Sequence, residues 1–314
     1  MIPSIRMRGL LNINKPSGIT SYDVIRRIKP IIKPKRIGHT GTLDPIGTGV
    51  LLILINEATK ISRFLLNQPK EYEAEIQFGV QTDTDDITGK PIATAPVPQI
   101  NFDEVAKAIT DKFIGELEQI PPRFSALKNN GTPLYKLARQ GVEVSPQPRR
   151  VKIYELELLN WQPPYARIRC LVSSGTYIRS LARDIGLALN SRATLTRLTR
   201  TRVGDFSLAS AIDLDNLTTT NTDIKNFLIP VEQALTQLPR ITVTTEQAQM
   251  LLQGKIITLP VSAPSIIPEI QNQPDSLPRE LHNTALALCP NRNFLALVKI
   301  SDNRVKTVKI IYAD

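Results

Sequence analysis

Residues 37–49 combine one acid with the residue types that build a tight, stiff loop. The stretch reads Ile-Gly-His-Thr-Gly-Thr-Leu-Asp-Pro-Ile-Gly-Thr-Gly, so Asp44 sits among four glycines and directly before Pro45. Glycine lets a backbone approach a ligand closely, and proline narrows the conformations open to the residue before it. The apolar run at 50–55 predicts a buried strand that anchors the loop. Asp44 is therefore a candidate nucleophile or general base.

Tyr72 and Arg179 could work beside such an acid. Residues 71–78 alternate strictly between polar and apolar, which predicts a half-buried strand with Tyr72 pointing inward at its start. Arg179 falls in the first turn of a predicted helix, where a cation opposes the helix macrodipole. That placement indicates pairing with a carboxylate or phosphate. The alternatives are an ordinary core tyrosine and a surface arginine.

Several other chemistries lack their motifs. The sequence holds no GxSxG elbow, no phosphate-binding loop ending in Gly-Lys-Ser/Thr and no HExxH helix. Two cysteines far apart, Cys170 and Cys289, and two histidines argue against a protein-built zinc site and suit a reducing cytoplasm. The apolar stretches are too short to cross a bilayer, and no signal peptide opens the chain, so we expect a cytoplasmic protein.

The net charge of +10 is unevenly distributed along the chain. Nine cations face only Asp23 before residue 37, and seven cations between 123 and 152 face only Glu143. A third block, the six arginines between 179 and 202, faces only Asp184. Segregated charge of this kind predicts a basic face for a polyanion, with a solvated surface as the alternative. Charge alone does not distinguish DNA from RNA.

The order of the predicted elements indicates an α+β fold with a mixed, mainly antiparallel sheet. Helical periodicity and strand patterning alternate irregularly, which does not fit a doubly wound sheet. The predicted helices are at 20–30, 102–113 and 178–189, and the predicted strands are at 71–78, 151–159 and 165–172.

A second unit is predicted to begin after Pro230. It contains a short helix near 246–252, a Pro- and Ser-rich surface excursion at 260–278, and three strands at 285–288, 294–300 and 305–312. We therefore expect a larger domain over residues 1–236 and a small β-rich domain over residues 239–314.

A set of motifs, taken in order, resembles the bacterial tRNA pseudouridine synthase B family. The motifs are Asn14-Lys15-Pro16-Ser17-Gly18, Gly38-His39-Thr40-Gly41-Thr42-Leu43-Asp44-Pro45, Lys70-Glu71-Tyr72, Gln119-Ile120-Pro121-Pro122, Ser125-Ala126-Leu127-Lys128, Leu134-Tyr135, Ala138-Arg139-Gln140-Gly141 and Ser174-Gly175-Thr176-Tyr177-Ile178-Arg179. Each motif alone is weak, whereas their joint order is very specific. The resemblance is strong over about residues 9–210 and loose over the rest.

The resemblance implies the pseudouridine synthase fold and the isomerisation of one uridine to pseudouridine in the T loop of tRNA, at the position conventionally numbered 55. No cofactor and no metal are implied. Asp44 would be the nucleophile that assists cleavage of the glycosidic bond, after which the uracil rotates and rejoins through carbon. The target base must be extruded from a folded loop. Tyr72 would stack on it, and Arg179 would pair with Asp44, keeping the carboxylate ionised and oriented.

The resemblance also assigns substrate-binding residues. His39 would fill the space that flipped bases vacate, and Leu198 would form an apolar wall of the uracil pocket. Tyr177 and Lys15 match motif positions near the site, and Lys15 is expected to support the loop instead of reacting. Residues 239–314 resemble a small RNA-binding module of the PUA type. The expected partner is the tRNA T stem-loop, bound by a monomer.

Two other functions fit parts of the sequence. A catalytically idle tRNA-binding or folding-assistance protein would carry the same charge, but the presence of Asp44 favours catalysis. A hydrolase could pair Asp44 with Asp83 or Asp85 and would release free uracil or cleaved sugar.

Two positions depart from the family pattern: Asn14 stands where Asp is often found, and Thr199 stands where a second arginine is common.

Overall fold

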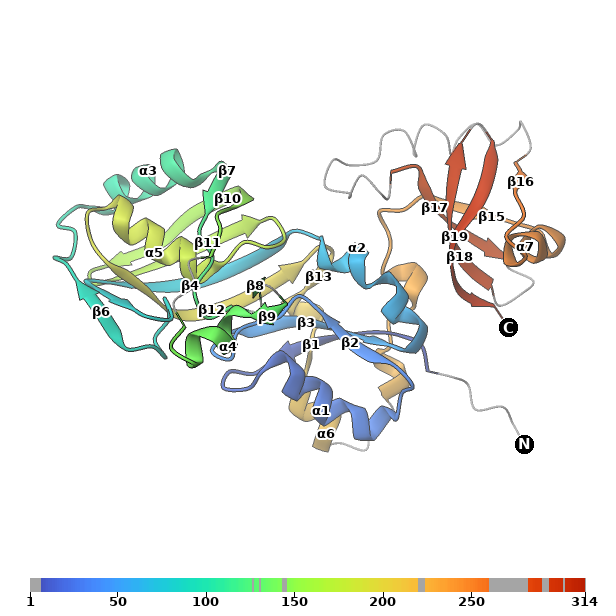
Figure 1. Ribbon diagram of the computed structural model, residues 1–314, viewed down its shortest axis with the longest axis horizontal. Coiled ribbons are helices and arrows are strands. Elements are labelled where there is room, and N and C mark those ends of the chain that lie inside the picture. The colour runs from blue at the N-terminus through green and yellow to red at the C-terminus, as the bar shows by residue number, and fades with distance from the viewer. Residues whose placement is uncertain are drawn as a thin grey trace. The chain divides into compact units, whose positions relative to one another are not determined.

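The computed structural model describes most of the chain. The described residues are 7–125, 127–129, 131–142, 146–219, 224–259, 282–289, 294–301 and 303–313. The chain divides into two compact units, and Figure 1 labels their helices and strands. Unit 1 comprises Met1–Asp44, Leu51–Gln68 and Ala209–Asp314, and unit 2 comprises Pro45–Val50 and Pro69–Leu208. The predicted excursion at 260–278 lies outside the described residues.

The first helix of unit 1 begins where its capping residues dictate. Helix α1 (Ser21–Ile32) has Thr20 as its N-cap, and Thr20 and Asp23 form a capping box. The helix continues two residues past Pro30, because Ile32 is still buried in the apolar core, and it ends at Lys33 in the left-handed conformation. The prediction of this helix is confirmed, apart from its end.

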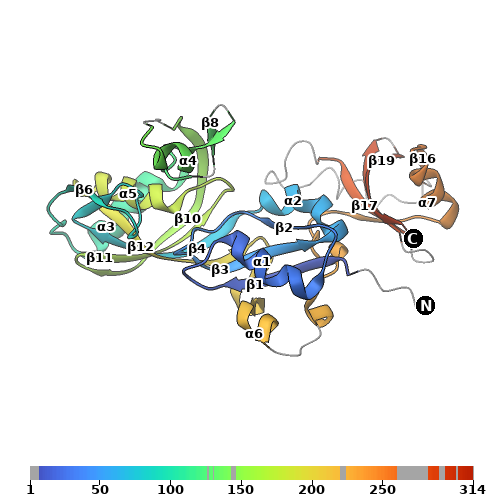
Figure 2. The same ribbon diagram turned by 60° about the horizontal axis from the view of Figure 1, so that its bottom comes forward.

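Helix α1 packs against strands that come from distant parts of the chain (Figure 2). Strand β1 (Gly9–Lys15) pairs in parallel with β14 (Ile212–Asp213), and β2 (Ile37–Thr40) pairs antiparallel with β3 (Thr48–Ile55). The apolar stripe of α1 contacts Leu11, Ile13, Leu51 and Ile53. Each apolar side chain buried there stabilises the fold by about 1.5–3 kcal/mol.

The other short elements of unit 1 follow β3 or β14 in the chain. They are η1 (Asn56–Ile61), α2 (Ser62–Leu66), α6 (Leu214–Thr219), η3 (Ile224–Phe227) and η4 (Val231–Gln233). The 3-10 turn η2 (Leu208–Ser210) lies at the boundary between the units.

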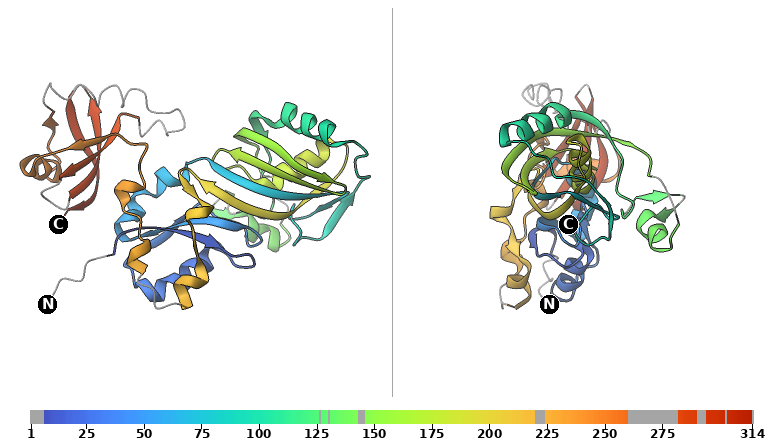
Figure 3. Two further views of the ribbon diagram at one scale, coloured as in Figure 1. Left: turned by 180° about the vertical axis from the view of Figure 1, so that it is seen from behind. Right: turned by 90° about the vertical axis from the view of Figure 1, so that its left-hand side faces the viewer.

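The C-terminal part of unit 1 has its own sheet, with strand order β15-β17-β18-β19-β16. The strands are β15 (Arg240–Thr242), β17 (Thr284–Cys289), β18 (Phe294–Ser301), β19 (Arg304–Ala313) and β16 (Ile257–Thr258). Helix α7 (Thr245–Leu252) packs beside them around one apolar core (Figure 3). The predicted β-rich C-terminal part is thus confirmed, whereas the boundary at 239 stays a prediction.

The main sheet of unit 2 is antiparallel, with strand order β12-β4-β11-β10-β7. The strands are β12 (Ala193–Val203), β4 (Lys70–Phe78), β11 (Tyr165–Val172), β10 (Arg149–Gln162) and β7 (Gly115–Gln119). The first residues of β3, which belong to unit 2, pair with β12 in parallel. The predicted mixed, mainly antiparallel sheet is confirmed.

Helices and short strands complete unit 2. Helix α3 (Phe102–Phe113) packs on β10 and helix α5 (Ile178–Ala188) packs on β12. Asn101 caps α3 in a capping box with Glu104. The remaining elements are β5 (Val80–Thr82), β6 (Pro91–Thr94), β8 (Lys128–Asn129), β9 (Thr132–Pro133), α4 (Leu134–Arg139) and β13 (Phe206–Ser207).

Strand β4 has two chemically different faces because successive side chains of a strand point to opposite sides. Its buried positions are Lys70, Tyr72, Ala74, Ile76 and Phe78, and its partly exposed positions are Glu71, Glu73, Glu75 and Gln77. The alternation predicted from the sequence, with Tyr72 inward, is confirmed.

The contact between β3 and β12 gives a test of this packing. Gly49 has a φ of +99°, and a Cβ atom there would lie 2.2 Å from the backbone oxygen of Arg200. We expect Gly49→Ala to lower the free energy of unfolding by about 1–3 kcal/mol, because the backbone must shift. Urea unfolding of both proteins measures the difference.

The control is Gly38→Ala, since a Cβ atom at Gly38 meets nothing within 4 Å. Equal stability losses in the two variants would contradict the predicted clash.

Candidate functional site

Asp44 lies in the loop between β2 and β3, and the chain is anchored on both sides of it. On one side the Leu43 N–H donates to Ser21 Oγ at 2.9 Å, and Ser21 Oγ donates to the Leu43 carbonyl at 3.1 Å. On the other side the hydroxyls of Thr48 and Thr199 are 2.9 Å apart. Asp44 itself is partly exposed. The buried strand predicted at 50–55 is confirmed as part of β3 (Thr48–Ile55), which follows this loop.

Lys15 and His39 both lie in unit 1, Lys15 at the end of β1 and His39 in β2. Lys15 is fully buried at the end of β1, and its Nζ donates to the carbonyls of Pro16 and Ile19 at 2.8 and 2.7 Å. These bonds hold the turn after β1, and the expected support of the Asp44 loop by Lys15 stays a prediction. His39 is partly buried in β2, opposite Ile53. Direct contact of Lys15 or His39 with a substrate stays a prediction.

Tyr72 and Leu198 share the buried face of the unit 2 sheet. The register places Tyr72 opposite Arg200 and Leu198 opposite Ala74, so Tyr72 and Leu198 are diagonal neighbours on β4 and β12. Both side chains are buried. On the other side of Tyr72, β11 contributes Cys170, whose pKa burial raises to about 12. The structure thus brings two of the predicted site residues together.

Two buried cations accompany Tyr72 on this face, and the sequence analysis missed both. Arg200 is fully buried, and its Nε donates to the Val50 carbonyl at 2.7 Å. Lys70 is also buried, and desolvation, aided by the charge of Arg200, lowers its pKa to about 7. The alternation of β4 could have revealed Lys70, because it lies two residues before Tyr72 and therefore on the same face.

Arg179 is buried at the start of α5, so the alternative of a surface arginine is wrong. Its Nη1 donates to the Thr84 carbonyl and its Nη2 donates to the Phe124 carbonyl, both at 3.0 Å. Its Nη1 also lies 3.7 Å from Asp86 Oδ2. These contacts fix the guanidinium between the loop after β5 and the connector after β7. The expected pairing of Arg179 with Asp44 stays a prediction.

The loop after β5 holds its carboxylates by local bonds. Asp86 Oδ1 accepts from the Thr84 hydroxyl and the Thr88 N–H, both at 2.9 Å. Asp85 Oδ2 lies 3.0 Å from Arg183 Nη1 of α5. Burial raises the pKa of Asp85, and the Arg183 charge opposes that rise. From the sequence, Asp85 is expected only as a possible second acid of a hydrolase, and local patterns do not predict its ion pair with Arg183.

Gln119 positions the segment that precedes Arg179. Its Nε2 donates to the Tyr177 carbonyl at 3.1 Å, and its Oε1 accepts from the Tyr177 N–H at 2.8 Å. Ser180 Oγ donates to the Ile120 carbonyl at 2.8 Å. Gln119 is buried, so this reciprocal pair of bonds satisfies its amide. From the sequence, Gln119 is notable only as part of a motif, and the role of Tyr177 as a binding residue stays a prediction.

The third basic block is largely neutralised by acids that lie far away in the sequence. Arg197 Nε lies 3.5 Å from Glu75, and Arg202 Nη2 lies 3.2 Å from Glu71. Arg183 bridges to Asp184 as well as Asp85. Counting charges along the chain therefore overestimated the positive field of this block, because β4 carries its acids beside β12.

The described residues show no group of three or more His, Cys, Asp and Glu side chains that could hold a metal ion. Among the same residues, no helix is both long enough and apolar enough to cross a membrane.

Two solved structures of H/ACA complexes share the fold of this chain. An H/ACA RNP bound to a substrate RNA containing 2′-deoxyuridine superposes with a TM-score of 0.66 at 22% identity, covering 97% of this chain and 85% of that chain. An archaeal box H/ACA sRNP complex gives a TM-score of 0.65, also at 22% identity, covering 97% and 86%. At such identities the likeness concerns the fold alone.

Matches to family models and to curated relatives identify the family of this chain. Residues 29–178 match the N-terminal domain of the TruB family pseudouridylate synthases, and residues 179–236 match the tRNA pseudouridylate synthase B C-terminal domain. The tRNA pseudouridine synthase B of Clostridium tetani is 44% identical over 248 residues, which are 79% of this chain and 85% of the relative. That of Francisella philomiragia is 47% identical over 214 residues, 68% and 70%. The chain belongs to the TruB family of pseudouridylate synthases.

The lowered pKa of Lys70 predicts that the stability of the protein depends on pH. Because folding lowers its pKa from 10.5 to about 7, the unfolded chain binds more protons than the folded chain between these values. The free energy of unfolding of the parent protein should therefore rise with pH across this window, relative to Lys70→Met. Urea unfolding of both proteins from about pH 6 to pH 9 measures this difference. A difference that does not change with pH would show that Lys70 keeps an ordinary pKa.

Proposed function

We propose that this protein converts the uridine at position 55, in the T loop of tRNA, to pseudouridine. The observation that carries the proposal is the 44% identity to a tRNA pseudouridine synthase B over 85% of that protein's length. The motifs that surround Asp44, Tyr72 and Arg179 lie within the matched family models. The basic composition of the chain suits a nucleic-acid substrate.

The reaction exchanges one bond for another within a single nucleotide. The bond from the ribose C1′ to N1 of uracil breaks, the base rotates, and a new bond forms from C1′ to C5. The proton on C5 is released and N1 gains a proton, so the product has the same mass as the substrate. No electrons leave the nucleotide, and the proposal includes no cofactor.

Asp44 is the proposed nucleophile. It precedes Thr48 by four residues, which span at most about 14 Å of extended chain. Thr48 pairs with Thr199 on β12, the strand that carries Leu198. The anchoring of Leu43 and Thr48 supports a carboxylate whose reach is restricted, which favours a single attacking geometry.

Tyr72 and Leu198 are the proposed walls for the flipped base. They are diagonal neighbours on one buried face, so an aromatic ring and an apolar side chain lie side by side there. A flipped uracil binds by stacking on such a surface. Arg179, held by the Thr84 and Phe124 carbonyls, is proposed to orient the Asp44 carboxylate. His39, Tyr177 and Lys15 remain the proposed support and RNA contacts.

The C-terminal sheet is proposed to contact the tRNA outside the T loop as a small RNA-binding domain over residues 239–314. Lys299 and Lys306 are directly opposite each other on β18 and β19, and Arg304 lies two residues from Lys306. Like charges that face each other in a sheet are unfavourable unless an anion lies nearby. A phosphate backbone supplies that anion. We propose that the protein works as a cytoplasmic monomer.

The direct test is incubation with unmodified tRNA, followed by mapping of pseudouridine through its carbodiimide adduct. Pseudouridine at position 55 and nowhere else is the expected result. Release of free uracil would instead identify a hydrolase, and unmodified tRNA that stays bound would identify a binding protein.

Replacing the proposed nucleophile separates catalysis from binding. Asp44→Ala should reduce pseudouridine formation below detection while tRNA affinity changes by less than about threefold, because loss of a nucleophile removes the chemical step alone. Asp111→Ala is the control, since Asp111 is exposed in α3. If Asp44→Ala still forms pseudouridine, Asp44 is not the nucleophile.

Changing the geometry of the cation tests Arg179. Arg179→Lys should lower turnover about 100-fold, because an ammonium cannot reproduce the planar fork that holds the Thr84 and Phe124 carbonyls. Single-turnover rates at saturating enzyme measure the effect. The matched control is Arg169→Lys on the solvent face, which should remain within about twofold because Arg169 forms exposed ion pairs. Equal rates for both variants would refute the role of Arg179.

A further inference from the structure

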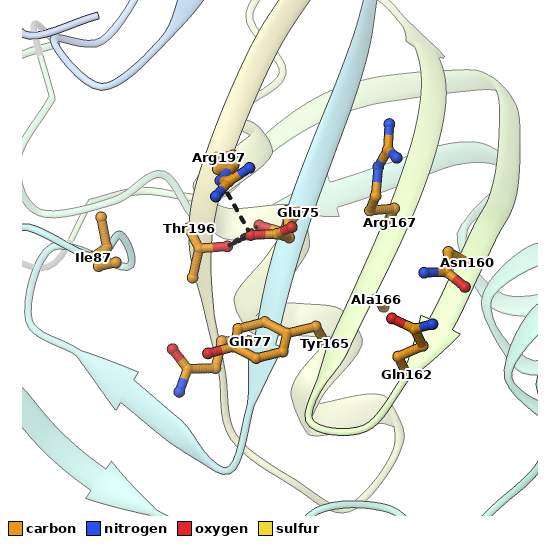
Figure 4. Close-up of a pocket in the computed structure, with 10 residues that line it drawn as sticks. All are labelled: Glu75, Gln77, Ile87, Asn160, Gln162, Tyr165, Ala166, Arg167, Thr196 and Arg197. Carbon is orange, nitrogen blue, oxygen red and sulfur yellow. Dashed lines mark hydrogen bonds and ion pairs between the residues drawn. The ribbon is translucent and has the colours of Figure 1, made fainter.

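A hollow of about 390 Å³ opens on the solvent face of the unit 2 sheet (Figure 4). It lies over β12, β4, β11 and β10, on the face that carries the outward residues of β4, whereas Tyr72 points to the opposite face. Ile87, from the loop after β5, adds an exposed apolar side chain at its border. None of the residues proposed for catalysis lines it.

The first row of side chains across the hollow places an aromatic ring between two amides. Tyr165 on β11 is directly opposite Gln77 on β4 and Gln162 on β10. Tyr165 is 43% exposed, so much of its ring is open to solvent. An exposed ring on a sheet is a stacking platform for any nucleobase. The flanking amides each carry donors and an acceptor, which match the polar edges of a base.

The second row is charged. Glu75 on β4 is opposite Arg167 on β11 and Arg197 on β12, and Asn160 follows on β10. The Glu75 carboxylate accepts from the Thr196 hydroxyl at 2.9 Å and lies 3.5 Å from Arg197 Nε. The side chains of Arg197 and Arg167 are 83% and 54% exposed. Two accessible guanidinium groups around one compensated carboxylate suit a phosphate.

A second outward acid of β4, Glu73, lies beside this charged row. Glu73 lies between Arg167, at 3.3 Å, and Arg169, at 2.9 Å. Glu73 is therefore shared by two arginines, and Arg169 also lies 3.3 Å from Glu157. Although these ion pairs balance the charges, the side chains of Arg167 and Arg197 stay 54% and 83% exposed, so both guanidinium groups are accessible to a phosphate.

The two rows are two residues apart along each strand, which corresponds to about 7 Å. A base and its phosphate are separated by one ribose, so a nucleotide can engage both rows at once. We propose that this hollow binds one unpaired nucleotide, with its base on Tyr165 and its phosphate between Arg167 and Arg197. A base paired in a helix cannot lie flat on the ring, so the ligand is a single-stranded RNA segment or a free nucleotide.

The test uses the full-length protein and two probes: fluorescein-labelled hexaadenylate, followed by fluorescence polarisation, and AMP, followed by titration calorimetry. Tyr165→Ala should weaken hexaadenylate binding about tenfold, the usual effect of removing one stacking aromatic. Tyr165→Phe should bind within about twofold of the parent, because it keeps the ring. Arg197→Gln should weaken hexaadenylate binding. It should also reduce the steepness of log Kobs against log salt concentration by about one, the effect of losing one phosphate contact. AMP binding that depends on Tyr165 identifies a free nucleotide, and binding of hexaadenylate alone identifies an RNA strand.

Tyr154→Ala is the matched control, since Tyr154 is outside the hollow, next to Lys152 on β10. In all these variants, the rate of pseudouridine formation on an isolated T stem-loop should stay within about twofold of the parent rate. Failure of the nucleotide-binding proposal is therefore distinguishable from failure of the proposed catalytic function. The inference is overturned if neither probe binds. It is also overturned if Tyr165→Ala, folded by circular dichroism, binds as tightly as the parent or no more weakly than Tyr154→Ala.

Discussion

The two-residue repeat of strand β4 is the constraint on which the rest of unit 2 depends. It directs Tyr72 and Lys70 to the buried face and three glutamates to solvent. The neighbouring strands obey the same repeat, so Leu198 joins the buried face, while Arg167 and Arg169 meet the glutamates outside. One strand thereby separates the buried face of Tyr72 and Leu198, which we propose holds the flipped base, from a charged face toward solvent. A slip of one residue would exchange the two.

Around this strand, several buried polar side chains form hydrogen bonds with backbone atoms. Arg179 donates to two carbonyls, Arg200 donates to a third, and Gln119 holds both backbone groups of Tyr177. Charged groups are retained in an interior only when their bonds are nearly complete. These bonds also prevent the first turn of α5 from moving independently of the connector after β7. The proposed site thus owes its rigidity to hydrogen bonds that involve no substrate.

Much of this arrangement could be predicted from the sequence, and the failures have a common cause. Local patterns were sufficient for α1, α3, α5 and the strands, because capping residues and periodicity depend on near neighbours. They were insufficient for Arg197 and Arg202, whose partners, Glu75 and Glu71, come from a strand more than 120 residues earlier. The burial of Lys70, by contrast, follows from the alternation of β4. The bonds of Gln119 to Tyr177 failed to appear for the same reason as the partners of Arg197 and Arg202. Their partners are set by tertiary contacts that a linear reading does not contain.

The approach of β3 to β12 also limits how the sequence can change. At Gly49 the obstacle is a main-chain oxygen, the one on Arg200, and not a side chain. A second mutation usually relieves a steric conflict by making a neighbouring side chain smaller, but every amino acid carries this same atom. No replacement at position 200 can therefore make room for a larger residue at position 49. Any suppressor must alter the path of one of the two strands, so a substitution at position 200 alone cannot compensate for a larger residue at position 49.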